Sequence, residues 1–364
     1  MHERGNKLGY YTVALCWGST GPLYAGYMLS GGYSWRLYFY VEAAFAAALL
    51  ILAFLFVEET TYKRDTPNPS TPQSDPGERK VFGQDEAGKE GVPVDHVEVQ
   101  TLVPPRRTFL QTLKPWSAIN RDEEFFMTIA RSFTYFLVPS VLWVVTSFGI
   151  YIGLGALVFN FTFPILITSP PYGWKEENSG LIALGNIIGY GLAVPLTWTS
   201  DRLAARLTKR NNGIREAEMR LGVIIPAAVI GPCGLIVYGL TAQRHLHWIG
   251  YFVGVAMTDW ASYFFFTFTL AYAVDSYTAN TSEMLIAMCV GKQLISFAFG
   301  LYLLDWVQES GYAVIIAGVF CAVLFINNLA VIPFMLFGKR IRTFYAHTWL
   351  ASMHRRSAKQ VMTH

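Results

Sequence analysis

The sequence predicts an all-α membrane protein with about eight transmembrane helices. Hydrophobic residues make up 53% of the 364 residues and charged residues only 15%, whereas a globular protein carries about 25% charged residues. The apolar residues gather in runs of bilayer length, and almost every Lys and Arg lies between those runs on alternate connections. Composition, run length and charge placement therefore indicate the same fold class.

The apolar runs have the length that a membrane helix needs. A helix rises 1.5 Å per residue, so about 20 residues cross a hydrocarbon core of about 30 Å. No run alternates apolar and polar residues as a barrel strand does, so each is expected to be a helix. The expected spans are residues 10–29, 37–57, 132–160 with an extension to 167, 179–199, 221–240, 247–273, 284–304 and 311–337.

Lys and Arg predict the side on which each connection lies. The connections rich in these residues are 1–9, 63–131, 202–220 and 339–359, whereas the alternate ones hold only Arg36, Lys175 and Arg244. Because basic residues concentrate on the cytosolic side, both termini are expected in the cytosol. The plasma membrane is the expected location, and an even number of spans follows.

Four regions are expected along the chain. Residues 1–57 hold two spans, 58–131 form a cytosolic linker, 132–338 hold six spans, and 339–364 form a basic cytosolic tail. The stretch 65–100 is rich in Pro, Ser, Gly and charge, so it is expected to be disordered. The later stretch with Phe109, Leu110, Leu113 and Trp116 suits either a segment along the membrane interface or a solvated connector.

Composition and spacing exclude several function classes. The net charge of +3 is too small to indicate a nucleic-acid partner. The four cysteines have neither disulfide nor zinc-ligand spacing, and no metal or cofactor is expected. No nucleophile elbow, phosphate-binding glycine loop or metalloprotease helix is present, so an enzyme is not expected.

Three motifs stand in a fixed order around the spans. GSTGPLYAGY lies in the first span, FVEETTYKR follows the second, and WTSDRLAARLTKR follows the fourth. Together with the two-plus-six arrangement, they resemble the fungal drug:proton antiporter group of the major facilitator superfamily, without its first four helices. The resemblance covers residues 8 to about 340 and implies a partial major facilitator fold.

The resemblance assigns roles to two of these motifs. The first looks like the antiporter motif, although Trp17 and Ala25 depart from the family's glycines. The third looks like the second copy of the cytosolic gate motif, although a cluster that merely obeys the positive-inside rule is the plainer interpretation. The motif residues are Gly18, Gly21, Pro22 and Gly26 for the first, and Asp201, Arg202 and Arg206 for the gate.

Two ionisable residues are expected near the middle of the membrane. Asp259 lies about twelve residues into the sixth span and Lys292 about eight residues into the seventh. A charge there costs at least ~2.5–3.5 kcal/mol, so such groups face a cavity or a partner. The two spans are joined by the short loop DSYTANTSE, which favours neighbouring helices and an Asp259–Lys292 pair. A structural ion pair and a substrate or proton site are both open.

Further candidates for solute binding or proton coupling come from polar and aromatic residues within spans. Each has a structural alternative: interhelical hydrogen bonding for the amides, vestibule exposure for the glutamate, and lipid or packing contacts for the aromatic residues. The rings after Asp259 offer a cation–π wall for a cationic solute. These candidates are Asn160, Asn186, Glu42, Trp260 and Tyr263.

The resemblance implies a secondary transporter of small organic solutes, with cationic solutes as candidates, coupled to protons by alternating access. Its expected partners are the solute, protons and the lipid bilayer. One alternative is an inactive truncated transporter. Another is a membrane scaffold or accessory subunit that holds partners through the linker and the basic tail.

Overall fold

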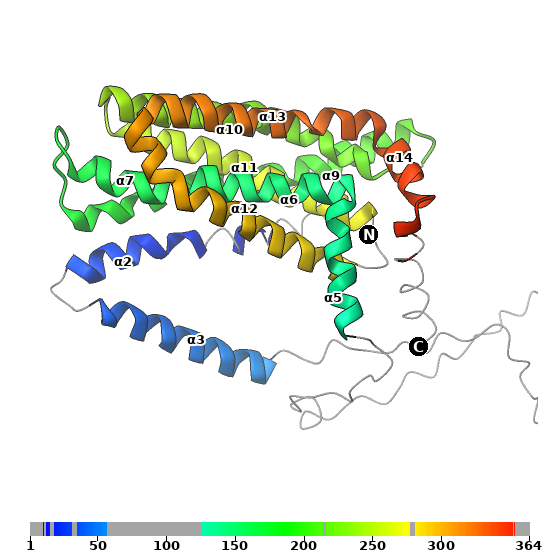
Figure 1. Ribbon diagram of the computed structural model, residues 1–364, viewed down its shortest axis with the longest axis horizontal. Coiled ribbons are helices and arrows are strands. Elements are labelled where there is room, and N and C mark those ends of the chain that lie inside the picture. The colour runs from blue at the N-terminus through cyan, green and yellow to red at the C-terminus, as the bar shows by residue number, and fades with distance from the viewer. Residues whose placement is uncertain are drawn as a thin grey trace, which may run out of the picture. The chain divides into compact units, whose positions relative to one another are not determined.

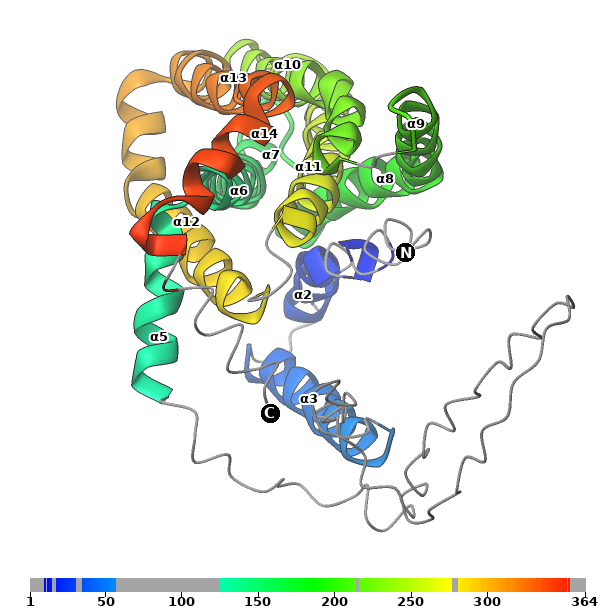
Figure 2. The ribbon, with the colours of Figure 1, turned by 90° about the vertical axis from the view of Figure 1, so that its right-hand side faces the viewer.

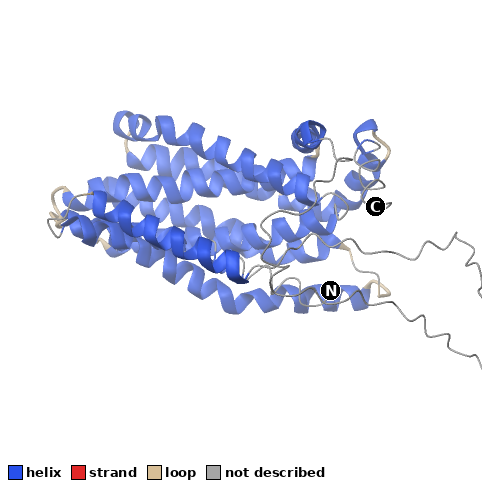
Figure 3. Cartoon of the chain, turned by 90° about the horizontal axis from the view of Figure 1, so that it is seen from below, coloured by secondary structure: helices blue, strands red, loops and turns tan. Residues whose placement is uncertain are grey.

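The computed structural model describes residues 10, 12–14, 18–30, 35–56, 125–213, 216–276, 281–351 and 353. Within these ranges the chain forms helices and turns and contains no strand (Figure 3). The prediction of an all-α fold is confirmed. Most of the predicted linker 58–131, including its interfacial stretch, lies outside the described residues.

Six stretches of the described chain are long and apolar enough to cross a membrane. They agree with six of the predicted spans to within about nine residues at each end. The predicted span 10–29 lies partly outside the described residues. The six stretches are Arg36–Phe56, Pro139–Thr168, Glu176–Leu196, Ala217–Arg244, Thr281–Ser310 and Ala313–Ala346.

The predicted span 247–273 forms helix α11 (Ile249–Ser276) but is not one of these six stretches. Thr258, Asp259 and Ser262 dilute its apolar content. Nineteen of its 28 residues are buried, because α11 packs among other helices along most of its length. A helix that faces protein rather than lipid tolerates polar residues that a lipid-facing helix does not.

Several spans are built from more than one helical segment. The third runs through α6 (Pro139–Ile150), the π-helical η3 (Tyr151–Leu157) and α7 (Val158–Thr168). The fourth joins η4 (Glu176–Ile182), α8 (Ala183–Ala193) and η5 (Val194–Leu196), and α9 (Thr197–Arg210) continues from it. The fifth joins η6 (Ala217–Ile224) to α10 (Ile225–Arg244). The seventh span is the single helix α12 (Thr281–Ser310). The eighth joins η7 (Ala313–Phe320), α13 (Cys321–Leu329) and α14 (Val331–Ala346).

The third span begins later than predicted because a separate helix precedes it. α5 (Phe125–Thr134) and η2 (Tyr135–Leu137) end at Val138, whose extended backbone turns the chain, and Pro139 opens α6. α5 runs across the direction of α6 (Figure 1) and packs against α12. Phe126 and Phe133 on α5 are exposed, whereas Ser132 is buried.

The chain divides into two units, 1–42 with 120–363 and 43–119. α3 (Arg36–Phe56) passes from the first to the second. Within the first unit α11 packs on α10, α8 and α6, while α12 packs on the other side of α6 (Figure 2). η7 and α13 cover α10, and α2 (Gly21–Ser30) packs on η4.

The contact between α10 and α11 depends on two glycines. A Cβ atom on Gly254 would lie 2.8 Å from the Gly234 carbonyl oxygen, and a Cβ atom on Gly234 would lie 2.6 Å from the Gly254 carbonyl oxygen. Neither position leaves room for a side chain, so the two backbones meet directly. This contact holds α11, and with it Asp259, at the centre of the unit.

The prediction that the sixth and seventh spans are neighbours is wrong. α6 packs against both α11 and α12 and lies between them in the view of Figure 2. A short connection limits only how far apart two helix ends lie, so it does not prevent a third helix from packing between their bodies.

Candidate functional site

Asp259 lies in the interior of the bundle on α11. Its side chain is 4% exposed, and the hydroxyl of Tyr190 on α8 donates a hydrogen bond to its carboxylate. The Ser262 hydroxyl, one turn further along, lies 3.5 Å from the Tyr190 hydroxyl and donates to the Asp259 carbonyl oxygen at 2.9 Å. Asp259 is thus held by polar groups of α8 and α11.

Lys292 lies on α12 and is half-buried. Its ammonium lies 5.9 Å from the centre of the Phe148 ring on α6, and Phe148 stacks on Phe266 of α11 at 4.4 Å. Within the described chain Lys292 makes no ion pair with Asp259. Phe266 is seven residues from Asp259 along α11, a rise of about 10 Å. The predicted pair is therefore absent, because α6 and this offset keep the groups apart.

The remaining candidates differ in whether a solute could reach them. Asn186 on α8 is buried, Asn160 on α7 is half-buried, and Glu42 on α3 is exposed. Tyr263 is fully buried, and its hydroxyl lies 2.8 Å from that of Thr197. Trp260 is half-buried and packs on Phe264 at 4.6 Å.

The structure describes only part of the predicted gate. Arg202 and Arg206 on α9 are exposed and have no ion-pair partner within the described chain. The side chain of Asp201 lies outside the described residues. The gate assignment therefore stays a prediction.

Four ion pairs lie at the end of the first unit where α9 ends and α14 carries its basic residues. We call it the basic end; it lies at the right of Figure 1. Each pair joins two different elements, so together they link α5 to α12, η6 to α11, and the start of the fifth span to α14. The pairs are Arg131–Glu283 at 3.3 Å, Arg220–Asp275 at 3.5 Å, Arg342–Glu218 at 2.7 Å and Lys339–Glu216 at 3.1 Å.

The basic members of these pairs were expected only as charges of the cytosolic connections, so the pairs themselves were not predicted. Of their acidic members, Glu218 lies between Arg215 and Arg220, and Glu283 lies at the start of the seventh span on the side with the basic connections. Acidic residues at the boundary of a span on a strongly basic side are a usable signal for such pairs.

A second polar cluster was also missed. Asn328 on α13 is fully buried and its amide nitrogen donates to the Tyr151 hydroxyl at 3.0 Å and to the Ala228 carbonyl at 3.3 Å. The side chain of its neighbour Asn327 bonds Ser147 at 3.0 Å and Thr146 at 2.9 Å on α6. This cluster ties α13 to α6, η3 and α10 and has the character of interhelical hydrogen bonding.

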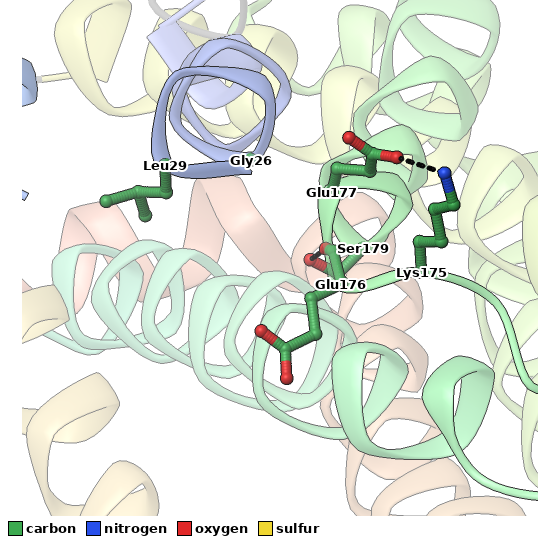
Figure 4. Close-up of a pocket in the computed structure, with 6 residues that line it drawn as sticks. All are labelled: Gly26, Leu29, Lys175, Glu176, Glu177 and Ser179. Carbon is green, nitrogen blue, oxygen red and sulfur yellow. Dashed lines mark hydrogen bonds and ion pairs between the residues drawn. The ribbon is translucent and has the colours of Figure 1, made fainter. Parts of the chain in front are cut away.

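The predicted antiporter-like motif packs on the fourth span. A Cβ atom on Gly26 would lie 2.8 Å from the carbonyl oxygen of Glu177, so this position leaves no room for a side chain. Beside this contact lies a pocket of about 660 Å³ between α2 and the start of η4 (Figure 4). The pocket is lined by Gly26, Leu29, Lys175, Glu176, Glu177 and Ser179, and Lys175 pairs with Glu177 at 3.5 Å. Within the described chain no three His, Cys, Asp or Glu residues form a metal-binding group.

Comparison with known proteins places this helical bundle in a family. The sequence model of the Major Facilitator Superfamily matches residues 1–302. The chain therefore belongs to the Major Facilitator Superfamily, as the order of its motifs predicted.

The chain is similar to several fungal proteins of this superfamily. An uncharacterised MFS-type transporter of Schizosaccharomyces pombe is 25% identical over 98% of this chain and 66% of its own length. A protein of Saccharomyces cerevisiae named as a probable drug/proton antiporter is 23% identical over 93% of this chain and 60% of its own length. A probable efflux pump of Aspergillus flavus is 34% identical over 39% of this chain and 34% of its own length. These curated relatives are longer than the chain, which covers at most about two thirds of each. No solved structure matches the chain.

Proposed function

We propose that this protein is a secondary active transporter that moves small organic solutes across a membrane by alternating access, driven by protons. Family membership supports the proposal, as do the names of the fungal relatives, which include transporters, efflux pumps and a probable drug/proton antiporter. The proposed orientation places both termini in the cytosol, with the plasma membrane as the site of action.

The observation that carries the proposal is a pair of ionisable side chains inside the apolar bundle that do not neutralise each other. Asp259 is bonded to Tyr190, and Lys292 lies over Phe148. A buried charge in a membrane bundle costs at least ~2.5–3.5 kcal/mol. A merely structural role would be served as well by a neutral residue, so this cost favours groups that bind and release a proton or solute.

In the proposed mechanism Asp259 is the proton carrier. The hydrogen bond between its carboxylate and Tyr190 links α8 and α11. A carboxyl group that gains a proton loses its charge, and the energetic cost of its burial falls with it. Protonation therefore changes how tightly the two helices are held, which is a means of coupling the proton to movement of the bundle.

The ion pairs at the basic end have the proposed role of holding that end closed. They join elements of four spans, and Asp201, Arg202 and Arg206 would add a clasp beside them. Opening this end requires these pairs to separate. Hydration of the freed charges lowers the free-energy cost of that separation. The antiporter-like motif with Gly18, Gly21, Pro22 and Gly26 has the proposed role of a close-packed pivot against η4.

Transport by the purified chain in proteoliposomes tests the proposal. An imposed pH gradient should drive accumulation of a fluorescent organic solute. Asp259→Asn should abolish gradient-driven accumulation but retain exchange of labelled for unlabelled solute. Asp305→Asn is the matched control, because Asp305 is an exposed carboxylate on α12, and it should behave as wild type.

Two results would count against the proposal. Accumulation by Asp259→Asn equal to wild type would remove Asp259 from proton coupling. Absence of both accumulation and exchange in the wild-type chain, with loss of cellular function on deleting residues 58–100, would favour the scaffold alternative.

A further inference from the structure

Lys292 has no acidic partner within the described chain. The described elements that pack most extensively on α12 are α5, η2, α6, η3, α7 and η7, and none of them contains Asp or Glu. On α12 itself, Glu283 is paired with Arg131 and lies nine residues away, a rise of about 14 Å. Asp305 is thirteen residues away in the other direction, about 20 Å.

The Phe148 ring does not offset the cost of placing the ammonium here. A cation over a ring gains about 0.5–2 kcal/mol, whereas a charge in the middle of a membrane costs at least ~2.5–3.5 kcal/mol. The remaining free-energy cost of placing the ammonium here must be offset by an anion or by water. Because Lys292 is half-buried, part of the residue is accessible to such a partner.

The side chains that would bind a cationic solute, the Asp259 carboxylate and the aromatic rings after it, are mostly buried. Asp259 is 4% exposed and bonded to Tyr190. In the aromatic run that follows it, Tyr263, Phe264 and Phe265 are each 2% exposed or less. Of the predicted cation–π wall only Trp260 is half-buried.

The surroundings of Lys292 combine one positive charge with apolar surface. Ile295 and Phe299 follow it at helical spacing and are half-buried, as Lys292 is. Phe148 and Phe266 form a stacked pair beside the ammonium. A charge next to aromatic and aliphatic side chains matches a molecule with one anionic group and an apolar body.

We infer that Lys292 binds the anionic group of the transported solute, and that the solute is an amphipathic organic anion such as an aromatic carboxylate. The inference rests on the proposed function and narrows its substrate class. The carboxylate pairs with the Lys292 ammonium, and the apolar body packs beside Phe148, Ile295 and Phe299. Asp259 is left free for the proton.

Binding of a matched pair of fluorescent probes to the purified full chain in detergent tests this inference. One probe is an aromatic carboxylate and the other its methyl ester, which has the same rings without the charge. The wild-type chain should bind the carboxylate about tenfold or more tightly than the ester. Lys292→Met should remove that preference, and Lys292→Arg should keep most of it. Gln293→Met, at the next and exposed position on α12, should leave both affinities unchanged.

Equal binding of the two probes by the wild type, binding of neither, or an unchanged preference in Lys292→Met would overturn the inference. Proteoliposome uptake separates this failure from failure of the proposed function. Gradient-driven uptake of a neutral or cationic solute without carboxylate preference would retain the transporter and reject the substrate class. A carboxylate preference that depends on Lys292, without any uptake, would retain the binding site for the anionic group and reject the transporter function.

Discussion

Replacing Arg342 with Met should destabilise the protein more than replacing its partner Glu218 with Gln. The Glu218 side chain is 9% exposed and the Arg342 side chain 25%. One guanidinium nitrogen of Arg342 lies 2.7 Å from one carboxylate oxygen of Glu218 and 2.9 Å from the other. Removing Arg342 leaves a buried carboxylate without its cation, whereas removing the charge of Glu218 leaves a guanidinium that can reach water.

The magnitudes follow from this difference in exposure. Breaking a buried ion pair from one side costs 3–5 kcal/mol, and Arg342 is not fully buried, so Arg342→Met should lower the free energy of unfolding by about 2–4 kcal/mol. Glu218→Gln should cost about 1 kcal/mol. In the double variant the loss should be smaller than the sum of the two by about 1–3 kcal/mol.

Reversible unfolding in mixed detergent, followed by tryptophan fluorescence, measures these free energies. Lys339→Met is the control, because Lys339 lies on the same helix as Arg342 and its side chain is 76% exposed, while that of its partner Glu216 is 30% exposed. This pair should contribute at most about 1 kcal/mol. Equal losses for Arg342→Met and Lys339→Met, or strict additivity in the double variant, would refute the reasoning.

Three further changes probe other parts of the bundle. Gly234→Val places a side chain in the backbone of α11, so unfolding in detergent should show a loss of at least about 2 kcal/mol; wild-type stability would contradict the described contact. Asn328→Leu removes the hydrogen bond to Tyr151 and should lower the free energy of unfolding by about 1–2 kcal/mol in the same assay. A gain in stability would contradict a stabilising role for this hydrogen bond. Tyr190→Phe removes the donor to Asp259 and should slow proton-driven uptake about 5- to 10-fold, with solute exchange as the comparison; unchanged uptake would exclude that role.

Hydropathy was sufficient to predict the long apolar helices, because each depends on a continuous stretch of sequence, but it did not predict the separate helix α5. The structure extends the last span from the predicted Phe337 to Ala346, since basic residues such as Lys339 and Arg342 can remain helical beyond the apolar core. The central position of α11 did not follow from hydropathy. Asp259 within it was nevertheless found from the cost of placing a charge among apolar residues.

Contacts between segments far apart in the chain could not be predicted from the sequence. Arg342 and Glu218 are 124 residues apart, and Asn328 and Tyr151 are 177 apart. Nothing local indicates such partners. The Asp259–Lys292 pair was expected from a short connection, but a helix from elsewhere in the chain lies between them. Only part of the aromatic run after Asp259 was expected to offer a cation–π wall, since successive helical residues point about 100° apart. Which ring is accessible did not follow from the sequence, and in the structure Trp260 is half-buried whereas Tyr263, Phe264 and Phe265 are buried.

In the proposed mechanism the solute path passes Lys292. Accessibility of a single cysteine at position 292, in a variant whose four native cysteines are replaced, tests it most directly. We expect a charged, membrane-impermeant thiol reagent to modify this cysteine from either side of the membrane, and an aromatic carboxylate to protect it. A cysteine at Leu294, which is 61% exposed on α12, should react only with lipid-soluble reagents. Labelling at position 292 from one side alone or from neither, or protection by no solute, would contradict the account.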